Sequence, residues 1–434
     1  MDDCSLNGAY SFGTITDLKS LEILSINENY HNASTVNFSL GSSKNSLKSL
    51  SMFKCGFLNQ SIFPAVAQCR NLKSLDLSSN NLSDFTRERF SFMLARGSLQ
   101  DINLSDCHIS SEVLLKALTN CRSLRKLNLE KNLFSQLSAG FGFGGARRTL
   151  ESLNMASCGL VGQRILSVIT ACRRLKELDL SHNDFRGAFS DFSLGDAIYT
   201  LKSLKMNYCR INDPLLFTAL TSCYRMEKLS LSFNSLCSYA FGASVKTLRK
   251  INLSGNFFAS AEDLYRVFSC PKLESLNLST TRLNMIEPEL KFSGFGHASD
   301  VLRELVIANC QLRRSTVLMI FTSFPKLEKL DISKNCFYPF YKGFSLSESK
   351  NSLVEIKAEH SKFVDGHIIK ALTDCRNLEV LSLKYSSFPA MSSMVEFGSS
   401  TGFLRELSLI GCEISFSYWV DELKKCTRLQ KLEF

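Results

Sequence analysis

The sequence has no long apolar run and no block of like charge. No window holds the roughly 18 consecutive apolar residues that a membrane-spanning helix needs. The first ten residues, MDDCSLNGAY, carry acids where a secretory signal carries positive charge, and no apolar segment follows them. Neither a membrane span nor a signal peptide is therefore predicted. The formal net charge of +10 is spread along the chain, a balance that favours solubility and identifies no partner.

One phrase, L-x-x-L-x-L-x-x-(N/C)-x-(L/F), recurs along the whole chain. Its first apolar residue stands at Leu21, Leu47, Leu72, Leu99, Leu124, Leu150, Leu175, Leu201, Met226, Leu248, Leu273, Leu302, Leu327, Leu353, Leu378, Leu404 and Leu429. Most steps are 25 to 27 residues, and the two clear exceptions are 22 into Leu248 and 29 into Leu302. Alternate residues of a strand face opposite sides, so Leu127 and Leu129 are predicted to point inward. Since no single copy can bury its leucines alone, the copies must stack as parallel strands about 4.8 Å apart.

This phrase and its stride resemble the leucine-rich repeat family over essentially the whole chain. The resemblance implies an α/β solenoid: a leucine-rich-repeat horseshoe or arc with a parallel concave sheet and a convex side of short helices and irregular segments. We predict a single solenoid, residues 1–434, of about 17 repeat units. Cys4 and Leu6 fit a repeat already under way, and the chain stops inside a strand at "LQKLEF". The array is therefore expected to be truncated at both ends.

The residue that follows each strand alternates between two types. The series runs Cys4, Asn29, Cys55, Asn80, Cys107, Asn132, Cys158, Asn183, Cys209, Asn234, and then less regularly Asn256, Thr281, Cys310, Asn335, Ser361, Ser386 and Cys412. We call these positions the ladder. The resulting pairs of roughly 51 residues resemble the ribonuclease-inhibitor class. A further C-x-x-L phrase is similar to the cysteine-containing subclass found in F-box proteins, and it is also common in plant receptor ectodomains.

The cysteines and ladder asparagines have predicted structural roles. Cys55 and Cys69 lie 14 residues apart, as do Cys107 and Cys121, which suggests one disulfide in each double repeat as a hypothesis. The two members of such a pair should lie on different sides of the coil, farther apart than the roughly 5.5 Å between Cα atoms in a disulfide. Buried free thiols are therefore favoured. The asparagine amides are predicted to satisfy backbone groups where the chain leaves the strand.

The segments between strands are of two kinds. After Cys-type strands come stretches such as "SSEVLLKALTNC" (110–121), whose apolar spacing predicts short convex helices. After Asn-type strands the chain is rich in Gly, Ser and Phe, as in "SAGFGFGGARR" (138–148). Its glycines are not assigned to phosphate binding, because they lead into a strand rather than into a helix N-terminus. In every pair of repeats an apolar residue lies seven positions before the first leucine of one of the two repeats, and Gly follows this residue in six of the eight pairs. A feature that every pair repeats indicates a structural role.

The residues do not form a pattern typical of catalysis or metal binding. There is no C-x-x-C and only six His, so no metal site and no cofactor are predicted. Asp76, Asp179 and Asp331 recur in one slot of different repeats, which favours a solvated concave face over catalytic residues. We predict no catalytic residue and no small-molecule substrate. The chain is interpreted as a non-enzymatic protein.

The outward positions of the predicted sheet are the candidate partner-binding surface. Most of them are Ser, Asn, Asp, Glu or Lys. Aromatic rings interrupt this pattern at His182, Tyr208 and Phe233 in three successive repeats, with Lys131 two repeats before them. His360 and Tyr385 repeat the effect in two later neighbours. Rings on adjacent strands lie within contact range and can anchor a protein or peptide, or they can simply cover the edge of the sheet.

The predicted function is a protein-recognition scaffold of the cytosolic adaptor, substrate-receptor or immune-sensor type. Unpaired cysteines favour the cytosol. The alternative is an extracellular ectodomain fragment of a plant-like receptor, which the N-x-S sequons at Asn32, Asn37, Asn59 and Asn81 favour and the missing G-x-I-P phrase opposes.

Nucleic-acid binding is the third and least supported class. Arg147, Arg148, Arg173 and Arg174 form only small basic clusters on the return segments. A nucleic-acid surface should show a continuous basic stripe with stacking aromatic rings.

Overall fold

A computed structural model describes residue 2 and residues 16–29, 39–56, 62–83, 90–135, 137, 141–189, 193–286, 300–312, 318, 321–337, 345–363, 367–388, 397–412 and 416–434. Its internal contacts divide the chain into two compact units, Met1–Arg225 and Met226–Phe434. Each unit is an α/β solenoid of leucine-rich repeats, which confirms the predicted fold class.

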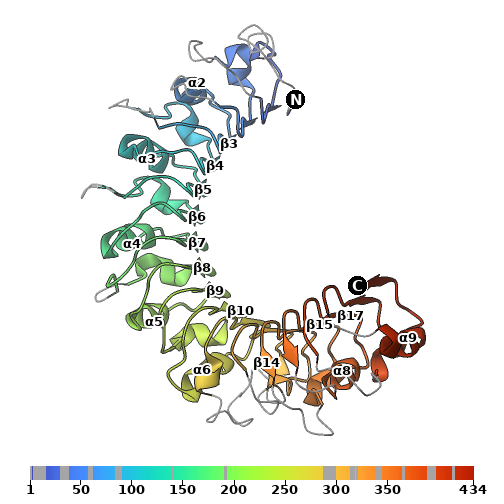
Figure 1. The fold of residues 1–434 in the computed structure, drawn as a ribbon. Coiled ribbons are helices and arrows are strands. Elements are labelled where there is room, and N and C mark those ends of the chain that lie inside the picture. The colour runs from blue at the N-terminus through green and yellow to red at the C-terminus, as the bar shows by residue number, and fades with distance from the viewer. Residues whose placement is uncertain are drawn as a thin grey trace. The chain divides into compact units, whose positions relative to one another are not determined.

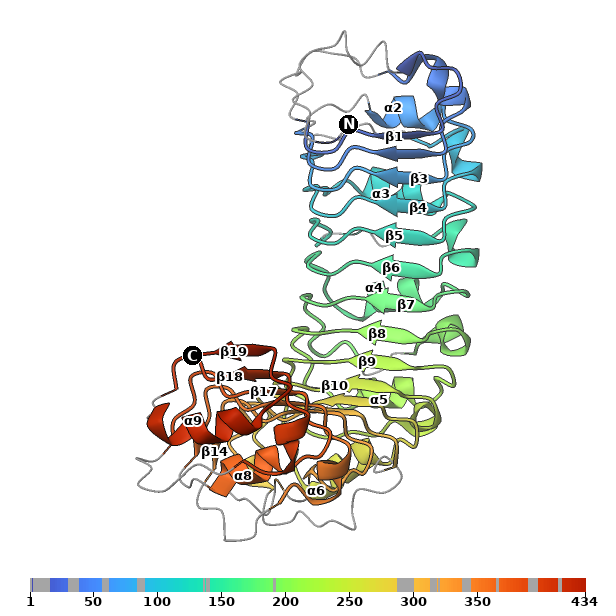
Figure 2. The same cartoon turned by 90° about the vertical axis from the view of Figure 1, so that its right-hand side faces the viewer.

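The first unit contains a parallel sheet with one short strand from each repeat. Its strands are β1 (Ile23–Ser25), β2 (Ser49–Ser51), β3 (Ser74–Asp76), β4 (Asp101–Asn103), β5 (Lys126–Asn128), β6 (Ser152–Asn154), β7 (Glu177–Asp179) and β8 (Ser203–Lys205). Each strand pairs with the next, and leucines at equivalent positions lie opposite one another, as Leu127 does with Leu153. Figure 2 shows these strands side by side. The leucines are buried as predicted, with Leu127 2% and Leu153 1% exposed.

The second unit repeats this arrangement. Its strands are β9 (Lys228–Ser230), β10 (Lys250–Asn252), β11 (Ser275–Asn277), β12 (Glu304–Val306), β13 (Lys329–Asp331), β15 (Glu355–Lys357), β17 (Val380–Ser382), β18 (Glu406–Ser408) and β19 (Lys431–Glu433). All of them are parallel and in register. The two irregular steps keep this register, since Ile251 lies opposite Leu229 and Leu276 opposite Leu305. A second small ribbon joins β14 (Cys336–Phe337) to β16 (Lys362–Phe363).

The return segments alternate between α-helices and short 3-10 helices. The α-helices are α2 (Ile62–Ala67), α3 (Glu112–Thr119), α4 (Gln163–Thr170), α5 (Leu215–Leu220), α6 (Ala261–Phe268), α8 (His367–Thr373) and α9 (Phe416–Lys425). The 3-10 helices are η1 (Gly41–Asn45), η2 (Ala95–Gly97), η3 (Ala146–Arg148), η4 (Gly195–Tyr199), η5 (Gly242–Lys246), η6 (Leu283–Met285), η10 (Ser347–Asn351) and η11 (Ser399–Gly402). In each unit the α-helices lie on the side opposite the strands (Figure 1). The predicted helices are confirmed, and the buried leucines lie between the two layers.

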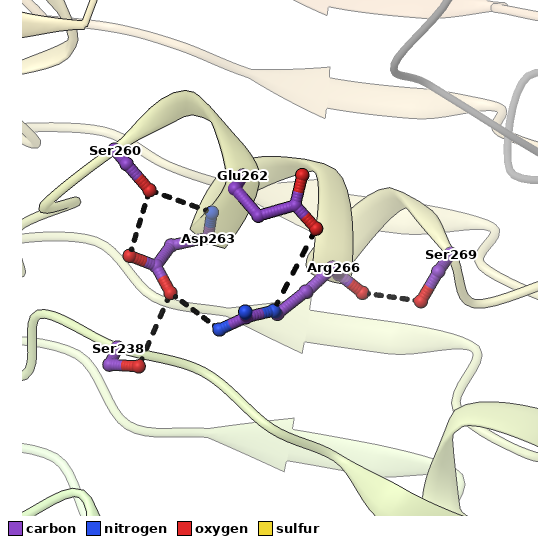
Figure 3. A network of polar contacts seen from close by, with 6 residues as sticks. All are labelled: Ser238, Ser260, Glu262, Asp263, Arg266 and Ser269. Carbon is purple, nitrogen blue, oxygen red and sulfur yellow. Dashed lines mark hydrogen bonds and ion pairs between the residues drawn. The ribbon is translucent and has the colours of Figure 1, made fainter.

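Helix α6 shows how a return segment is fixed at both ends (Figure 3). The Ser260 hydroxyl accepts from the backbone N–H of Asp263 at 3.4 Å and caps the helix. The buried Asp263 carboxylate accepts from the Ser260 and Ser238 hydroxyls at 3.3 and 3.2 Å and pairs with Arg266 at 3.1 Å. The Ser269 hydroxyl donates to the Arg266 carbonyl at 2.7 Å. Ser238 precedes β10, so the helix is also tied to the preceding repeat.

The ladder asparagines perform the predicted task. The Asn183 amide donates to the carbonyls of Met155 at 2.9 Å and Leu180 at 2.8 Å. Its oxygen accepts from the backbone N–H groups of Cys158 at 3.1 Å and Leu160 at 2.9 Å. Asn80, Asn132 and Asn335 make equivalent bonds to two repeats. Each amide therefore links its own repeat to the preceding one.

The ladder cysteines share part of this task, which the sequence interpretation as apolar filler missed. The Cys158 thiol donates to the Leu129 carbonyl at 3.0 Å, and Cys107 and Cys209 donate to Leu77 and Leu180 at 3.2 Å each. A thiol is a weak donor with one hydrogen, so it replaces only one of the amide's bonds. Because Asn and Cys alternate along the ladder, strong and weak hydrogen bonds between neighbouring repeats alternate as well.

The fifteen described cysteines are free thiols, and most are buried. Burial raises the pKa of the ladder thiol Cys107 and of the return-segment thiol Cys121 to about 12 each. These thiols therefore stay protonated and unreactive at neutral pH. The predicted position of Cys4 lies outside the described residues.

The glycine-rich return segment has a structural explanation. Gly144 follows the buried Phe143 and begins the turn into η3 with φ of +41°. Gly41, Gly195 and Gly242 take the same left-handed conformation after their own buried apolar residues. The motif is therefore architectural, as predicted, and Phe295 of the same series lies outside the described residues.

Substituting Gly144→Ala is expected to lower the free energy of unfolding by about 1–2 kcal/mol, the cost of a left-handed backbone for a residue with a Cβ. The new Cβ would also lie 2.5 Å from the Asn120 side-chain oxygen. Gly142→Ala is the matched control, because its φ is not left-handed and nothing lies within 4 Å of its Cβ position. Urea denaturation of both variants measures the difference, and equal losses would contradict the explanation.

Candidate protein-recognition edge

The residues just before the ladder positions form one column in each unit, at the carboxyl ends of the strands. We call this column the left-handed edge, because its non-glycine members have φ between 49° and 59°. Its members are Glu28, Lys54, Ser79, Asp106, Lys131, Ser157, His182 and Tyr208 in the first unit, and Phe233, Gly255, Thr280, Asn309, Lys334, His360, Tyr385 and Gly411 in the second. All six residues predicted to bind a partner belong to this edge.

Backbone hydrogen bonds between repeats hold the edge in its left-handed conformation. The N–H of His182 donates to the Asn207 carbonyl, that of His360 to Lys384 and that of Tyr385 to Ile410, each at 2.7 Å. A left-handed residue with a Cβ costs roughly 1–2 kcal/mol. The bond to the next repeat offsets this cost, so the edge is an ordered extension of the sheet.

The structure corrects where the predicted residues lie. They follow the strands rather than occupying outward strand positions, since β7 ends at Asp179 and His182 comes three residues later. The left-handed backbone breaks the alternation that the sequence reasoning extended past the strand. All six side chains are nevertheless exposed, with Tyr208 at 46%, Phe233 at 40% and Tyr385 at 55%.

Two pairs of rings on neighbouring repeats stack face to face. The centroids of His182 and Tyr208 lie 4.7 Å apart with 12° between the ring planes. His360 and Tyr385 repeat this arrangement at 4.9 Å and 17°. The predicted contact is confirmed for these two pairs. Lys131 stands two repeats before His182 on the same edge, and Phe233 belongs to the second unit.

Glycines make room for two of these rings, a relation that the sequence reasoning missed. A Cβ at Gly411 would lie 2.4 Å from the Tyr385 ring, and one at Gly255 would lie 2.6 Å from the Phe233 ring. Each ring therefore lies over the bare backbone of the next repeat. The sequence signal was available as an aromatic residue followed one repeat later by glycine. Packing of this kind limits the rotamers of the ring and lowers the entropy cost of binding.

The recurring Asp and Asn slot on the concave sheet is half-buried and structural. The Asp179 carboxylate accepts from the Ser181 N–H at 3.0 Å, and Asp331 accepts from Ser333 at 2.9 Å. Asn154 does the same for Ala156 at 3.0 Å. These side chains close turns at the strand ends, so the interpretation as a merely solvated face was incomplete.

Charges on the concave sheet are of both signs and paired between strands. Lys205 of β8 lies 3.3 Å from Asp179 of β7. In the second unit Lys329 of β13 lies 3.1 Å from Glu355 of β15, which also pairs at 3.1 Å with Lys357 of its own strand. The exposed aromatic rings therefore adjoin a surface whose other side chains are mostly polar and carry charges of both signs.

Other predicted features fall partly outside the described residues. Asn32, Asn37 and Asn59 do so, while the sequon residue Asn81 is exposed. Within the ranges given above, no group of three or more His, Cys, Asp or Glu is placed to hold a metal ion. None of the helices described for this chain is long and apolar enough to cross a bilayer.

Comparisons with known proteins agree with this fold. A Leucine Rich repeat family model matches residues 68–84 and 171–188. Tubulin-specific chaperone E of Danio rerio is 25% identical over 253 residues, covering 55% of this chain and 47% of that protein. Protein PAC2 of Saccharomyces cerevisiae is 25% identical over 252 residues, covering 56% and 41%. A leucine-rich repeat protein of Leptospira interrogans, of known structure, is 19% identical with a TM-score of 0.56, covering 93% of this chain and 97% of that one.

The chain is built of leucine-rich repeats, as the matching family model and the solved structure also indicate. It spans less than half the length of the two curated relatives named above. The fold and these relatives support a protein-interaction scaffold.

Proposed function

We propose that this chain is a non-enzymatic scaffold that binds a protein or peptide ligand through the left-handed edge and the adjoining concave sheet. The observation that carries the proposal is the exposed, stacked pair His182 and Tyr208, which the pair His360 and Tyr385 repeats. Tyrosine is favoured at binding hot spots, because it adds large contact area at a small entropy cost. Here the rings are also held on a backbone bonded from repeat to repeat.

The free thiols support a cytosolic adaptor, substrate receptor or immune sensor over the ectodomain alternative. The mixed charges of the concave sheet support a protein ligand over a nucleic acid there. Tubulin, which the name of one relative mentions, is the first candidate partner. Purified tubulin is therefore the first ligand to test.

A photo-cross-linking residue at position 208 or 385 is expected to capture the partner. The same residue at position 116, on the outer surface of α3, is the control and should capture nothing above background. The captured protein is identified by mass spectrometry and then purified for direct binding. Adducts that form equally well at position 116 would contradict the proposed edge.

Tyr208→Ala is expected to weaken binding of that purified partner by about 30-fold, the typical effect of truncating a hot-spot residue by 2 kcal/mol. The Tyr208→Phe variant keeps the stacked ring and should retain most of the affinity. Isothermal titration calorimetry measures both, and circular dichroism confirms that the variants are folded. Unchanged affinity in folded Tyr208→Ala and Tyr385→Ala variants would overturn the proposal.

A further inference from the structure

Arginines that are far apart in the sequence line up along the opposite edge of the sheet in the first unit. We call Arg96, Arg122, Arg147, Arg148 and Arg173 the arginine flank. All five stand two or three residues before the first leucine of their repeats, on the amino-terminal side of the strands. The N–H of Arg122 donates to the Arg96 carbonyl at 2.9 Å, and the N–H of Arg173 donates to the Arg147 carbonyl at 3.0 Å.

The flank is continuous across four repeats. A Cβ built at Gly145 would lie 3.4 Å from Cγ of Arg122, so the stem of Arg122 packs against the repeat that carries Arg147 and Arg148. The sequence showed only small basic clusters, because the arginines of neighbouring repeats are about 25 residues apart. The parallel register brings them to roughly one strand spacing, about 4.8 Å per repeat.

Positive charge on the flank is largely uncompensated. All five arginines are exposed. Arg173 pairs with Asp196 at 2.9 Å, whereas the other four form no ion pair among the residues that the structure places. Glu151, which follows Arg147 and Arg148 in the same repeat, pairs with Lys176 at 2.7 Å and Arg125 at 3.8 Å. Four guanidinium groups therefore remain for a ligand.

A groove with an apolar wall opens beside the flank, between η3 and α4. Its volume is about 630 Å³. Phe143, Val168 and Ala171 supply its apolar wall, and Gln163 and Ser167 add polar groups. Arg147 belongs both to the groove and to the flank. A chain lying along the arginines can thus place one side chain in the groove.

We propose that the arginine flank and this groove bind an acidic polypeptide segment that carries one apolar anchor residue. Guanidinium groups bind carboxylates through paired, charge-assisted hydrogen bonds. An apolar wall favours an aliphatic or aromatic side chain. This surface is distinct from the left-handed edge, because the two lie at opposite ends of the strands.

A polypeptide fits this surface better than a single-stranded nucleic acid does. Non-specific nucleic-acid sites place aromatic rings among their basic residues to stack the bases. The described residues between Arg96 and Arg174 include no exposed Phe, Tyr or Trp. Tyr199, which is 62% exposed, stands one repeat beyond Arg173 and so lies outside the row of arginines.

Fluorescence anisotropy with the full chain tests the charge requirement. The probes are a labelled peptide of alternating Glu and Gly with one central Leu, the same peptide with Ala in place of Leu, and single-stranded polyadenylate. The variant Arg96→Glu, Arg122→Glu, Arg148→Glu is expected to bind the Leu peptide at least about tenfold more weakly, since three ion pairs become repulsive. The variant Lys116→Glu, Arg186→Glu, Arg210→Glu makes the same charge change on exposed return segments of the first unit, away from the flank and the left-handed edge, and should bind as the wild type does.

Filling the groove tests the anchor. The wild type is expected to bind the Leu peptide about three- to tenfold more tightly than the Ala peptide, the effect of burying a few methyl groups. Ser167→Trp should abolish this preference and leave the salt dependence unchanged. Equal binding of both peptides by the wild type would overturn the proposal, as would equal binding by the two triple variants or preferential binding of polyadenylate. None of these probes requires the left-handed edge, so this test can fail while the proposed function stands.

Discussion

Raising the pH above 9 is expected to unfold the first unit within about one to two pH units. Burial raises the pKa of eight thiols in that unit from 9.0 to about 11 or 12: Cys55, Cys69, Cys107, Cys121, Cys158, Cys172, Cys209 and Cys223. In the unfolded chain these thiols ionise near pH 9, whereas in the folded chain they stay protonated. Their contribution to stability is therefore complete below pH 9 and is lost as the pH rises toward the folded pKa values.

The free energy of unfolding is expected to fall steeply as the pH rises above 9. Each such thiol removes about 1.4 kcal/mol from the free energy of unfolding per pH unit, and eight remove about 11 kcal/mol. A loss of about 11 kcal/mol per pH unit is comparable to the whole free energy of unfolding of a typical domain, which is about 5–15 kcal/mol. The second unit has only four thiols whose pKa is raised this far, Cys270, Cys310, Cys375 and Cys426, so its slope should be about half as steep.

Urea denaturation between pH 7.5 and 10.5 under reducing conditions measures this slope. The variant Cys121→Ala, Cys172→Ala removes two thiols of the return segments and leaves the ladder intact. Its slope should be shallower by about 1.4 kcal/mol per pH unit for each thiol removed. A slope identical to that of the wild type would show that alkaline unfolding comes from other groups.

Asn183→Ala is expected to lower the free energy of unfolding of the first unit by about 4 kcal/mol. The substitution leaves the Met155 carbonyl without its amide donor, and the N–H groups of Cys158 and Leu160 without their acceptor. The Leu180 carbonyl loses the amide but keeps the Cys209 thiol as a donor. Each buried polar group left unsatisfied costs about 1–3 kcal/mol. Urea denaturation followed by circular dichroism gives the value.

Asn154 supplies a matched control in the preceding repeat. Its side chain lies on the outward face of β6, donates to Glu130 at 3.1 Å and accepts from the Ala156 N–H at 3.0 Å. Because water can replace both bonds there, Asn154→Ala should cost about 1 kcal/mol or less. Similar losses in the two variants would mean that the ladder amides do not link the repeats.

Much of the fold could be predicted, because each copy of the phrase repeats the same solution to the same burial problem. The alternation of Leu127 and Leu129 with polar neighbours determined which face is inward. The stride between copies determined that strands would be parallel. The repeat length and the buried face depend only on residue type and spacing, so both could be predicted from a single sequence.

The candidate site was predicted less completely. Its residues were found as departures from a periodic pattern, but their place beyond the strands depends on the left-handed backbone at His182 and its neighbours, which spacing does not encode. The packing of the Tyr385 ring over the backbone of Gly411 depends on contact between two neighbouring repeats. The arginine flank was missed for the same reason, because its members meet only through the register of the sheet.

Hydroxyl-radical footprinting of tyrosines, with and without the purified partner, tests the central claim most directly. Tyr208 and Tyr385 lie on the left-handed edge and are 46% and 55% exposed, while Tyr199 and Tyr224 of the amino-terminal side are 62% and 58% exposed. The four residues share one chemistry and similar accessibility. We expect the partner to protect Tyr208 and Tyr385 and to leave Tyr199 and Tyr224 unchanged; protection of the second pair alone would contradict recognition at the left-handed edge.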